Sequence, residues 1–369
     1  MSLKDSLEVG DYVLDFHGET DINPRFYFST VAGRWIILSF FGSLADPRAM
    51  AAQEAVMARR QRFDDTDRAY FGVSTDPDDR AFRGLKASPP GLRYFYDHDH
   101  AITRLFGVED ENGFQPRAYL LDRALRVVDI QPIERMPVLL DTLDTCLKAE
   151  AGSPAAWLAP VLTVPRVFEP ELCQQLIDYY EARGGTLSGV MREKDGLTVG
   201  VHDNRVKRRR DAAIEDKALR ELTRDRIARR LLPSIWRAFH WQATRIERYM
   251  VACYEGQDRG FFNPHRDNTT AGTAHRVFAV TLNLNSDYEG GELRFPEFGH
   301  TTYKPPPGGA TVFNCSILHE ATPVTSGIRY AFVPFLYDDE HAAIRTANHA
   351  KVVPQPIIPD PAKESQSAE

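Results

Sequence analysis

The sequence predicts two globular parts, an α/β part followed by an α+β part that is rich in strands. In the first part, apolar runs alternate with helical patterns. In the second, β-prone runs carry the polar motifs, and a stretch of small residues at 149–154 separates the two. A chain of 369 residues can hold two such cores. We therefore expect domains at 1–150 and 156–342 and a flexible, proline-rich tail at 343–369.

Composition is that of an ordinary globular protein, with 43% hydrophobic and 26% charged residues. A net charge of −7 argues against general attraction to nucleic acid or to an anionic membrane. No apolar run is long enough to predict a transmembrane helix, and the first residues lack the apolar core of a signal peptide. Four scattered cysteines without a C-x-x-C pair are typical of reduced thiols, so we expect a cytoplasmic protein.

The elements of the first part follow from apolar runs and helix-start signals. Residues 34–41 and 70–74 are continuous apolar runs, typical of strands buried on both faces. Pro47 opens an alanine-rich helix, and Asp76 begins the next one. Further strands are predicted at 94–96, 118–122 and 127–130, with a closing helix at 137–148. Between them, the alternating acids and histidines of 97–100 could hold a metal, but we favour Asp99 as a helix N-cap.

The second part begins with helices and continues as strands. A strand is predicted at 165–168, followed by a helix at 169–183 that Gly184 ends. Amphipathic spacing predicts another helix at 216–230, and Pro233 starts a short one after it. Residues 245–254 are predicted to form one strand that leads into the polar motifs.

Three residues in the second part form a candidate metal-binding set. His265 and Asp267 are two positions apart, so on a strand their side chains point to the same side. His319 would reach them from a distant strand. Two histidines and one carboxylate can hold a divalent iron and leave its opposite face open. Arg329 follows His319 by ten residues, and even spacing would put both on one face of a single strand.

The motifs around these residues resemble the Fe(II)/2-oxoglutarate-dependent dioxygenases, in particular the prolyl 4-hydroxylase-like group. The chain reads HRDN at 265–268, LN at 284–285 and GGELRF at 290–295, and it ends the motif with HE at 319–320 and RYA at 329–331. The resemblance covers about residues 156–340. It implies a double-stranded β-helix, or jelly-roll, of two facing sheets with helices against one side.

The resemblance also implies a ligand set and a co-substrate site. Fe(II) would be held by the catalytic residues His265, Asp267 and His319. The far carboxylate of 2-oxoglutarate would pair with Arg329, with Tyr254 facing the co-substrate. The family often has tyrosine where Asn283 stands, so the grip on the co-substrate would involve Asn283 or Thr281.

The expected reaction is hydroxylation of a C–H bond with O2, giving succinate and CO2, with ascorbate as an accessory reductant. A prolyl residue of a protein is the first candidate substrate, and a free amino acid or small metabolite is the alternative. Lys207 and Arg209 lie in a basic run, and with Phe262 they are candidates for a substrate rim. The plain alternative for the basic run is a solvated strand or loop whose alternate members pair with nearby acids.

The first part resembles the peroxiredoxins, which have a thioredoxin fold. The residues that carry this resemblance are EVGD at 8–11, ILSFF at 37–41, GVS at 72–74 and RAYLLD at 117–122. The segment 41–47, where that family keeps its nucleophilic cysteine, reads FGSLADP and contains none. We therefore expect a redox-inactive domain used for docking, homodimerisation or substrate presentation. A non-catalytic scaffold and a thiol peroxidase that uses Cys146 remain alternative readings of the whole chain.

Overall fold

A computed structural model describes residues 7–111, 113–151 and 158–353. The chain divides into two compact units, one of Met1–Leu158 with Pro296–Gly299, and one of Ala159–Phe295 with His300–Glu369. Part of the predicted linker at 149–154 lies outside the described residues. None of the described helices combines the length and apolar character needed to cross a bilayer.

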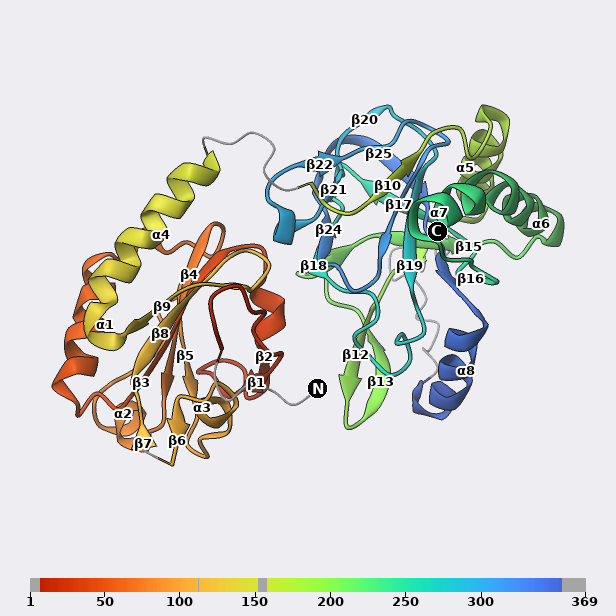
Figure 1. The fold of residues 1–369 in the computed structure, drawn as a ribbon. Helices are drawn as coiled ribbons and strands as arrows, with labels where there is room; N and C mark the ends of the chain where they lie inside the picture. The colour runs from red at the N-terminus through yellow and green to blue at the C-terminus, as the bar shows by residue number, and fades with distance from the viewer. Residues whose placement is uncertain (1–6, 112, 152–157, 354–369) are drawn as a thin grey trace, which may run out of the picture. The chain divides into compact units, whose positions relative to one another are not determined.

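The first unit is built on a five-stranded mixed sheet (Figure 1). Its central strands are parallel to each other and two antiparallel strands complete one side, in the order β5 (Leu92–Tyr96), β4 (Arg68–Ser74), β3 (Trp35–Gly42), β8 (Arg117–Leu121) and β9 (Val127–Pro132). Two small hairpins lie beside it, β1 (His17–Gly18) with β2 (Phe26–Tyr27), and β6 (Glu109–Asp110) with β7 (Gly113–Phe114). These strands confirm the predictions made from the apolar runs, while the thioredoxin-like fold of the unit stays a prediction.

Helices and aromatic rings cover the two faces of this sheet. The helices α1 (Pro47–Ala58) and α4 (Met136–Ala151) pack on one face, where their apolar side chains share a core with β3 and β4. Phenylalanine rings fill the other face, in stacked and edge-to-face pairs with Phe71 and Phe95 among them. The short helices are α2 (Pro77–Ala81) and α3 (Ala101–Leu105).

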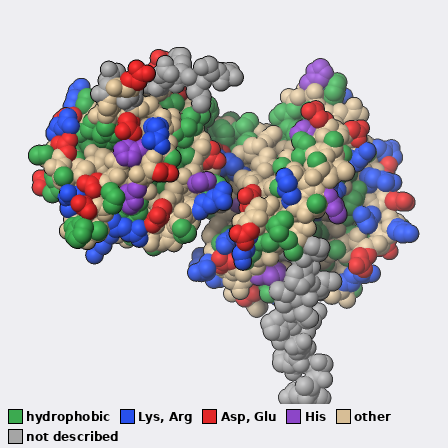
Figure 2. Space-filling view, turned by 90° about the horizontal axis from the view of Figure 1, so that it is seen from below, with side chains coloured by type: hydrophobic (Ala, Val, Ile, Leu, Met, Phe, Trp, Pro, Cys, Tyr) green, Lys and Arg blue, Asp and Glu red, His purple; other side chains and the backbone are tan. Residues whose placement is uncertain are grey.

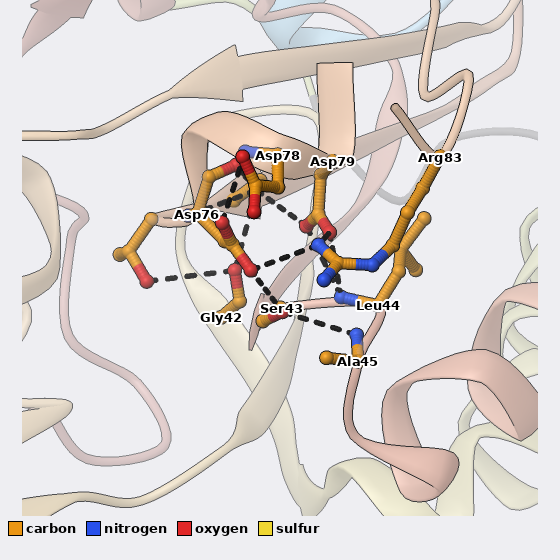
Figure 3. Close-up of polar contacts among 10 residues, drawn as sticks. Gly42, Ser43, Leu44, Ala45, Asp76, Asp78, Asp79 and Arg83 are labelled. Atoms are coloured by element: carbon orange, nitrogen blue, oxygen red, sulfur yellow. Dashed lines mark hydrogen bonds and ion pairs between the residues drawn. The ribbon is translucent and has the colours of Figure 1, made fainter. Parts of the chain in front are cut away.

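The loop that follows β3 is held by Ser43 and by side chains of the segment 76–83 (Figure 3). The fully buried carboxylate of Asp79 accepts hydrogen bonds from the backbone N–H of Leu44, at 3.0 and 3.1 Å, and from Arg83 at 2.8 Å. The Ser43 hydroxyl donates to Asp76 at 2.6 Å and accepts from the N–H of Ala45 at 3.0 Å. The backbone donors at this end of β3 therefore already have internal partners.

The segment 97–100 corrects the predicted cap of α3. Asp97, rather than Asp99, holds the start of the helix, because its buried carboxylate accepts from the backbone N–H groups of Ile102 and Thr103 at 2.9 and 2.8 Å. Asp99 accepts one longer bond, from Ala101 at 3.2 Å. The carboxylate of Asp97 is thus used by the helix, as an anion at a helix N-terminus is expected to be.

The second unit is a pair of antiparallel sheets. The larger, ten-stranded sheet has the order β10 (Leu162–Val164), β23 (Ala310–Asn314), β19 (Phe278–Asn283), β25 (Val324–Phe332), β17 (Met250–Glu255), β15 (Arg210–Ala213) and β11 (Thr186–Leu187), and it also includes β16 (Arg245–Glu247), β20 (Tyr288–Gly290) and β26 (Phe335–Tyr337). The smaller sheet has the order β14 (Lys207–Arg208), β18 (Phe261–His265), β24 (His319–Ala321), β21 (Leu293–Arg294) and β22 (Thr302–Tyr303). A hairpin of β12 (Val190–Lys194) and β13 (Leu197–Val201) is separate from both.

Alternation along β17 gives the larger sheet two different faces. Val251 and Cys253 point into the main core, which they share with the helices. Ala252 and Tyr254 point the other way, into a small cluster with Ala321 of the smaller sheet. Successive strand residues face opposite sides, so one face carries helices and the other is turned toward the smaller sheet. The predicted two-sheet arrangement is confirmed in this respect.

Three helices cover the outer face of the larger sheet: α5 (Pro170–Arg183), α6 (Lys217–Arg226) and α7 (Leu232–Phe239). Gly184 ends α5 with a φ of +68°, as predicted. The segment Ile227–Leu231 joins α6 to α7 as a π-helical turn, so the two predicted helices form one run. Figure 2 shows Lys and Arg side chains interspersed with acidic ones at the edge of this unit where α6 lies.

Two predicted strands are wrong in detail. The strand predicted at 165–168 is β10, which ends before Pro165; Val167 and Phe168 donate instead to the carbonyl of Gly308. The strand predicted at 245–254 is two strands, β16 and β17, which are interrupted at Arg248 with a φ of +67°.

The predicted flexible tail at 343–369 also needs correction at its start. Helix α8 (Asp339–Asn348) continues through it, capped by Asp338, whose carboxylate accepts from the N–H of His341. Val353 then donates to the carbonyl of Thr198 on β13. Residues 354–369 lie outside the described part of the chain.

Candidate active site

The smaller sheet brings the candidate metal ligands together. His265 ends β18 and lies directly opposite His319 of β24 in the sheet register. The two rings are 4.3 Å apart between centroids. Asp267 Oδ1 lies 3.5 Å from His265 Nε2, and Oδ2 lies 3.2 Å from His319 Nε2. The ligand atoms of all three residues lie within 4.8 Å of one another.

Local hydrogen bonds fix the orientation of both imidazoles. Nδ1 of His265 lies 2.8 Å from the carbonyl of Asn263, and Nδ1 of His319 lies 3.0 Å from that of Ile317. A carbonyl oxygen can only accept, so Nδ1 must carry the proton in each ring. That tautomer leaves the Nε2 lone pairs facing Asp267, as a metal ligand requires.

The charge states of these residues fit a divalent cation. Burial lowers the pKa of His265 to about 4, and the neighbouring His319 acts in the same direction, so His265 is neutral at pH 7. Burial alone would raise the pKa of Asp267, but the two imidazoles outweigh it and the pKa lies well below its ordinary value. A neutral imidazole beside an ionised carboxylate is the donor state that metal binding needs.

Two details of the predicted geometry are wrong. Asp267 is not on the strand with His265, because β18 ends at His265; a turn carries Asp267, whose N–H donates to Cys315 at 3.0 Å. His319 and Arg329 are not on one strand either. The chain leaves the smaller sheet after Ala321, passes Pro323, and enters β25 of the larger sheet. Proline cannot donate to a strand ladder, which explains the break.

Arg329 lies on the site-facing side of the larger sheet, directly across from Tyr254. It is buried, with 2% of its surface exposed. Its Nε and Nη2 donate to Oδ1 of Asn283, at 3.2 and 3.1 Å, and its guanidinium lies 5.1 Å from the centre of the Tyr254 ring. Asn283 in turn donates to the carbonyl of Pro305 at 2.9 Å. A neutral amide thus orients the guanidinium of Arg329 without neutralising its charge.

The basic run at 207–210 alternates along two short strands: Lys207 and Arg209 are buried, whereas Arg208 is exposed. Arg209 is buried and forms an ion pair with Asp211, with Nε 2.6 Å from Oδ1, and it donates to the Tyr254 hydroxyl at 3.3 Å. Lys207 is also buried; it donates to the carbonyl of Gly189 and lies 4.5 Å from the centre of the Phe262 ring. Phe262 stacks on His265, with 3.4 Å between ring centres.

One cavity joins most of these groups. Its lining includes the three candidate ligands, three residues predicted for the co-substrate and two predicted for the substrate rim: His265, Asp267, His319, Tyr254, Thr281, Arg329, Arg209 and Phe262. Among the described residues, Asn283 and Lys207 do not line it. Arg248 does, and sequence reasoning missed it, because an arginine inside a β-prone run gives no sign of a break in the strand.

Comparison with known proteins identifies the class of this domain. Residues 249–337 match the family model of the 2OG-Fe(II) oxygenase superfamily. The chain therefore contains a 2OG-Fe(II) oxygenase domain, and the family implies Fe(II) and 2-oxoglutarate. The segment includes every candidate residue named above except Lys207, Arg209 and Arg248.

Individual relatives are similar over part of the chain. A PKHD-type hydroxylase of Synechococcus sp. (strain JA-2-3B'a(2-13)) is 34% identical over 99 residues, which is 25% of this chain and 43% of the relative. A PKHD-type hydroxylase of Delftia acidovorans (strain DSM 14801 / SPH-1) is 40% identical over 87 residues, 21% of this chain and 38% of the relative. The chain thus spans less than half the length of these relatives.

A solved structure of a Trichoplax adhaerens prolyl hydroxylase, in complex with a hypoxia inducible factor oxygen degradation domain peptide fragment, is 18% identical with a TM-score of 0.38. It covers 50% of this chain and 86% of its own.

Proposed function

We propose that this protein is an Fe(II)- and 2-oxoglutarate-dependent dioxygenase that hydroxylates a C–H bond and releases succinate and CO2. One observation carries the proposal: His265, Asp267 and His319 converge within 4.8 Å in a cavity that also contains a buried arginine, which donates to the neutral amide of Asn283. A two-histidine, one-carboxylate set with open positions is typical of non-haem Fe(II) oxygenases.

The residues present would divide the work. His265, Asp267 and His319 would hold Fe(II), which together with 2-oxoglutarate supplies the activation of O2. Arg329, oriented by Asn283, would pair with the far carboxylate of 2-oxoglutarate through two hydrogen bonds. The guanidinium groups of Arg209 and Arg329 lie 5.7 and 5.1 Å from the centre of the Tyr254 ring, and Tyr254 would form one wall of the co-substrate site. Ascorbate stays a predicted accessory.

The substrate and the role of the first unit stay predictions. A prolyl residue of a protein is the first candidate substrate. For the first unit we propose a non-catalytic role. A reactive thiolate at the end of β3 would need free backbone N–H donors, but these donors already bond to Asp79 and Ser43 (Figure 3). Asp46 accepts from the N–H of Arg48 as the N-cap of α1. Docking and homodimerisation through this unit are predictions on the same basis.

The proposal is tested by metal binding and by turnover. Mn(II) and 2-oxoglutarate are titrated into the wild-type protein, and succinate release is measured with Fe(II), ascorbate and O2. We expect Asp267→Ala to abolish both metal binding and succinate release. Asp178→Ala, on the exposed surface of α5, should leave both unchanged. Metal binding by Asp267→Ala as tight as by the wild type would overturn the proposed function.

A further inference from the structure

Arg248 occupies an unusual position in the cavity. It lies in the break between β16 and β17, with a φ of +67°. A residue other than glycine or asparagine adopts this left-handed region rarely. Such strain persists only where the surrounding structure imposes it, and it gathers at functional sites. Here the break turns the Arg248 side chain into the lining of the cavity that holds the candidate metal ligands.

No carboxylate is in direct contact with Arg248 among the described residues, although Asp211 and Glu247 lie near enough to favour its charge. The nearby arginines each have a carboxylate: Arg209 pairs with Asp211 at 2.6 Å and Arg276 pairs with Glu247 at 2.7 Å. Among the described residues, Arg248 has no hydrogen-bond or ion-pair partner, and its guanidinium lies 5.7 Å from the centre of the Phe335 ring.

Burial lowers the pKa of Arg248 to about 10. The positive charges of Arg276 and Arg209 act in the same direction, and the carboxylates of Asp211 and Glu247 act against it without cancelling it. A cation in this setting is costly unless an anion joins it.

Arg248 lies away from the expected co-substrate anchor. Phe335, which contacts Arg248, pairs with Ala279 of β19, whereas Arg329 is held by Asn283 four residues further along that strand. Four residues of a strand span about 13 Å.

The candidate metal ligands lie near the Arg248 end of this strand. Ala279 also pairs with Phe313, whose ring lies 4.5 Å from that of His319. A diacid that reaches from the metal ligands to Arg329 would therefore extend away from Arg248.

We propose that Arg248 binds a carboxylate of the hydroxylation substrate, which makes the substrate a small organic acid such as a free amino acid. This inference rests on the proposed function and selects the alternative substrate class over an internal prolyl residue. A guanidinium pairs with a carboxylate through two parallel hydrogen bonds. An internal residue of a polypeptide has no main-chain carboxylate to offer.

The test uses full-length protein loaded with Mn(II) and 2-oxoglutarate. The probes are the twenty common L-amino acids and their C-terminal amides, and the readouts are the thermal unfolding midpoint and calorimetric titration of the acids that raise it. We expect at least one acid to bind while its amide does not. Arg248→Gln should weaken that acid at least tenfold, and Arg248→Lys should weaken it less. The matched control is Arg166→Gln, at an exposed arginine with a φ of +57° outside the cavity, which should bind as the wild type does.

The arms of the experiment separate the remaining outcomes. The inference is overturned if no acid binds, if acid and amide bind alike, or if Arg248→Gln binds the acid as the wild type does. The affinity of Arg248→Gln for 2-oxoglutarate should stay within twofold of the wild type. A loss as large as that in Arg329→Gln would assign Arg248 to the co-substrate instead. If the wild type binds neither Mn(II) nor 2-oxoglutarate, the proposed function itself fails.

Discussion

At the scale of single residues, the amide of Asn283 decides how much charge Arg329 presents to the cavity. Its Oδ1 accepts two hydrogen bonds from the guanidinium without neutralising it. The amide is buried, with 1% of its surface exposed, so solvent does not moderate the contact. A carboxylate in the same place would form an ion pair with Arg329 and compete with any acid that approaches.

Asn283→Asp should therefore weaken 2-oxoglutarate binding by about tenfold, equivalent to about 1.4 kcal/mol. Calorimetric titration of the Mn(II)-loaded protein measures this, and metal affinity should not change. Asn285→Asp is the matched control, since Asn285 lies two residues along and contacts Asp287 and the backbone rather than Arg329. Wild-type affinity in Asn283→Asp would contradict the role given to Arg329.

The sequence was a good guide to residues whose chemistry is local and a poor one to those placed by the backbone. The spacing of His265 and Asp267 sufficed to suggest a shared site, even though the strand ends between them. Neither the contact of Asn283 with Arg329 nor the burial of Lys207 has a local signal. Both depend on which strands become neighbours, β19 with β25 and β14 with β18.

At the scale of elements, predictions succeeded where a terminal signal was present. Helices α1 and α2 begin where an aspartate precedes a proline, at Asp46–Pro47 and Asp76–Pro77, and α5 ends at Gly184. The π-helical turn between α6 and α7 and the break at Arg248 interrupt runs whose propensity is continuous. Such interruptions are imposed by packing and tertiary contacts, so a local pattern does not reveal them.

Glu169 links two of the helices on the outer face. It is the residue before α5, and it accepts from Arg226 at the end of α6 and from Arg230 in the π-helical turn. Hydrogen bonds from Arg226 are the main cause that lowers the pKa of Glu169 to about 2. A carboxyl group whose pKa is lowered in the folded state adds stability above its unfolded pKa, and that stability is lost as the pH falls through the folded value.

Glu169→Gln should accordingly lower the free energy of unfolding by about 1 kcal/mol at pH 7, as expected for a partly exposed ion pair. The difference from the wild type should shrink as the pH falls from 4.5 toward 2. Urea unfolding at pH 7 and pH 3 measures both values. Glu171→Gln, at an exposed position in the first turn of α5, should show neither effect. An equal loss at both pH values would mean that charge is not the cause.

At the scale of the whole molecule, a β-rich oxygenase domain is combined with a unit that has no thiol at the end of its first long strand. Burial raises the pKa of the Cys146 thiol, and the charges of Asp129 and Glu150 add to it. The other three cysteines are buried in the second unit. A protonated, shielded thiol is a poor nucleophile toward peroxide.

The protein should therefore show no thiol-dependent consumption of hydrogen peroxide. The assay uses metal-free protein with a chelator present, so that iron chemistry does not contribute. Cys146→Ser should behave as the wild type does. Peroxide consumption that disappears in Cys146→Ser would restore the thiol peroxidase interpretation of the first unit.

The separation of the candidate metal ligands from Arg329 has a mechanical consequence. The three ligands belong to the smaller sheet and the turn beside it, whereas the arginine belongs to the larger one. A molecule bound to both the metal ligands and Arg329 would connect the smaller sheet to the larger one. Binding in the cavity would then restrict the motion of the two sheets relative to each other, and product release after each turnover would restore that motion.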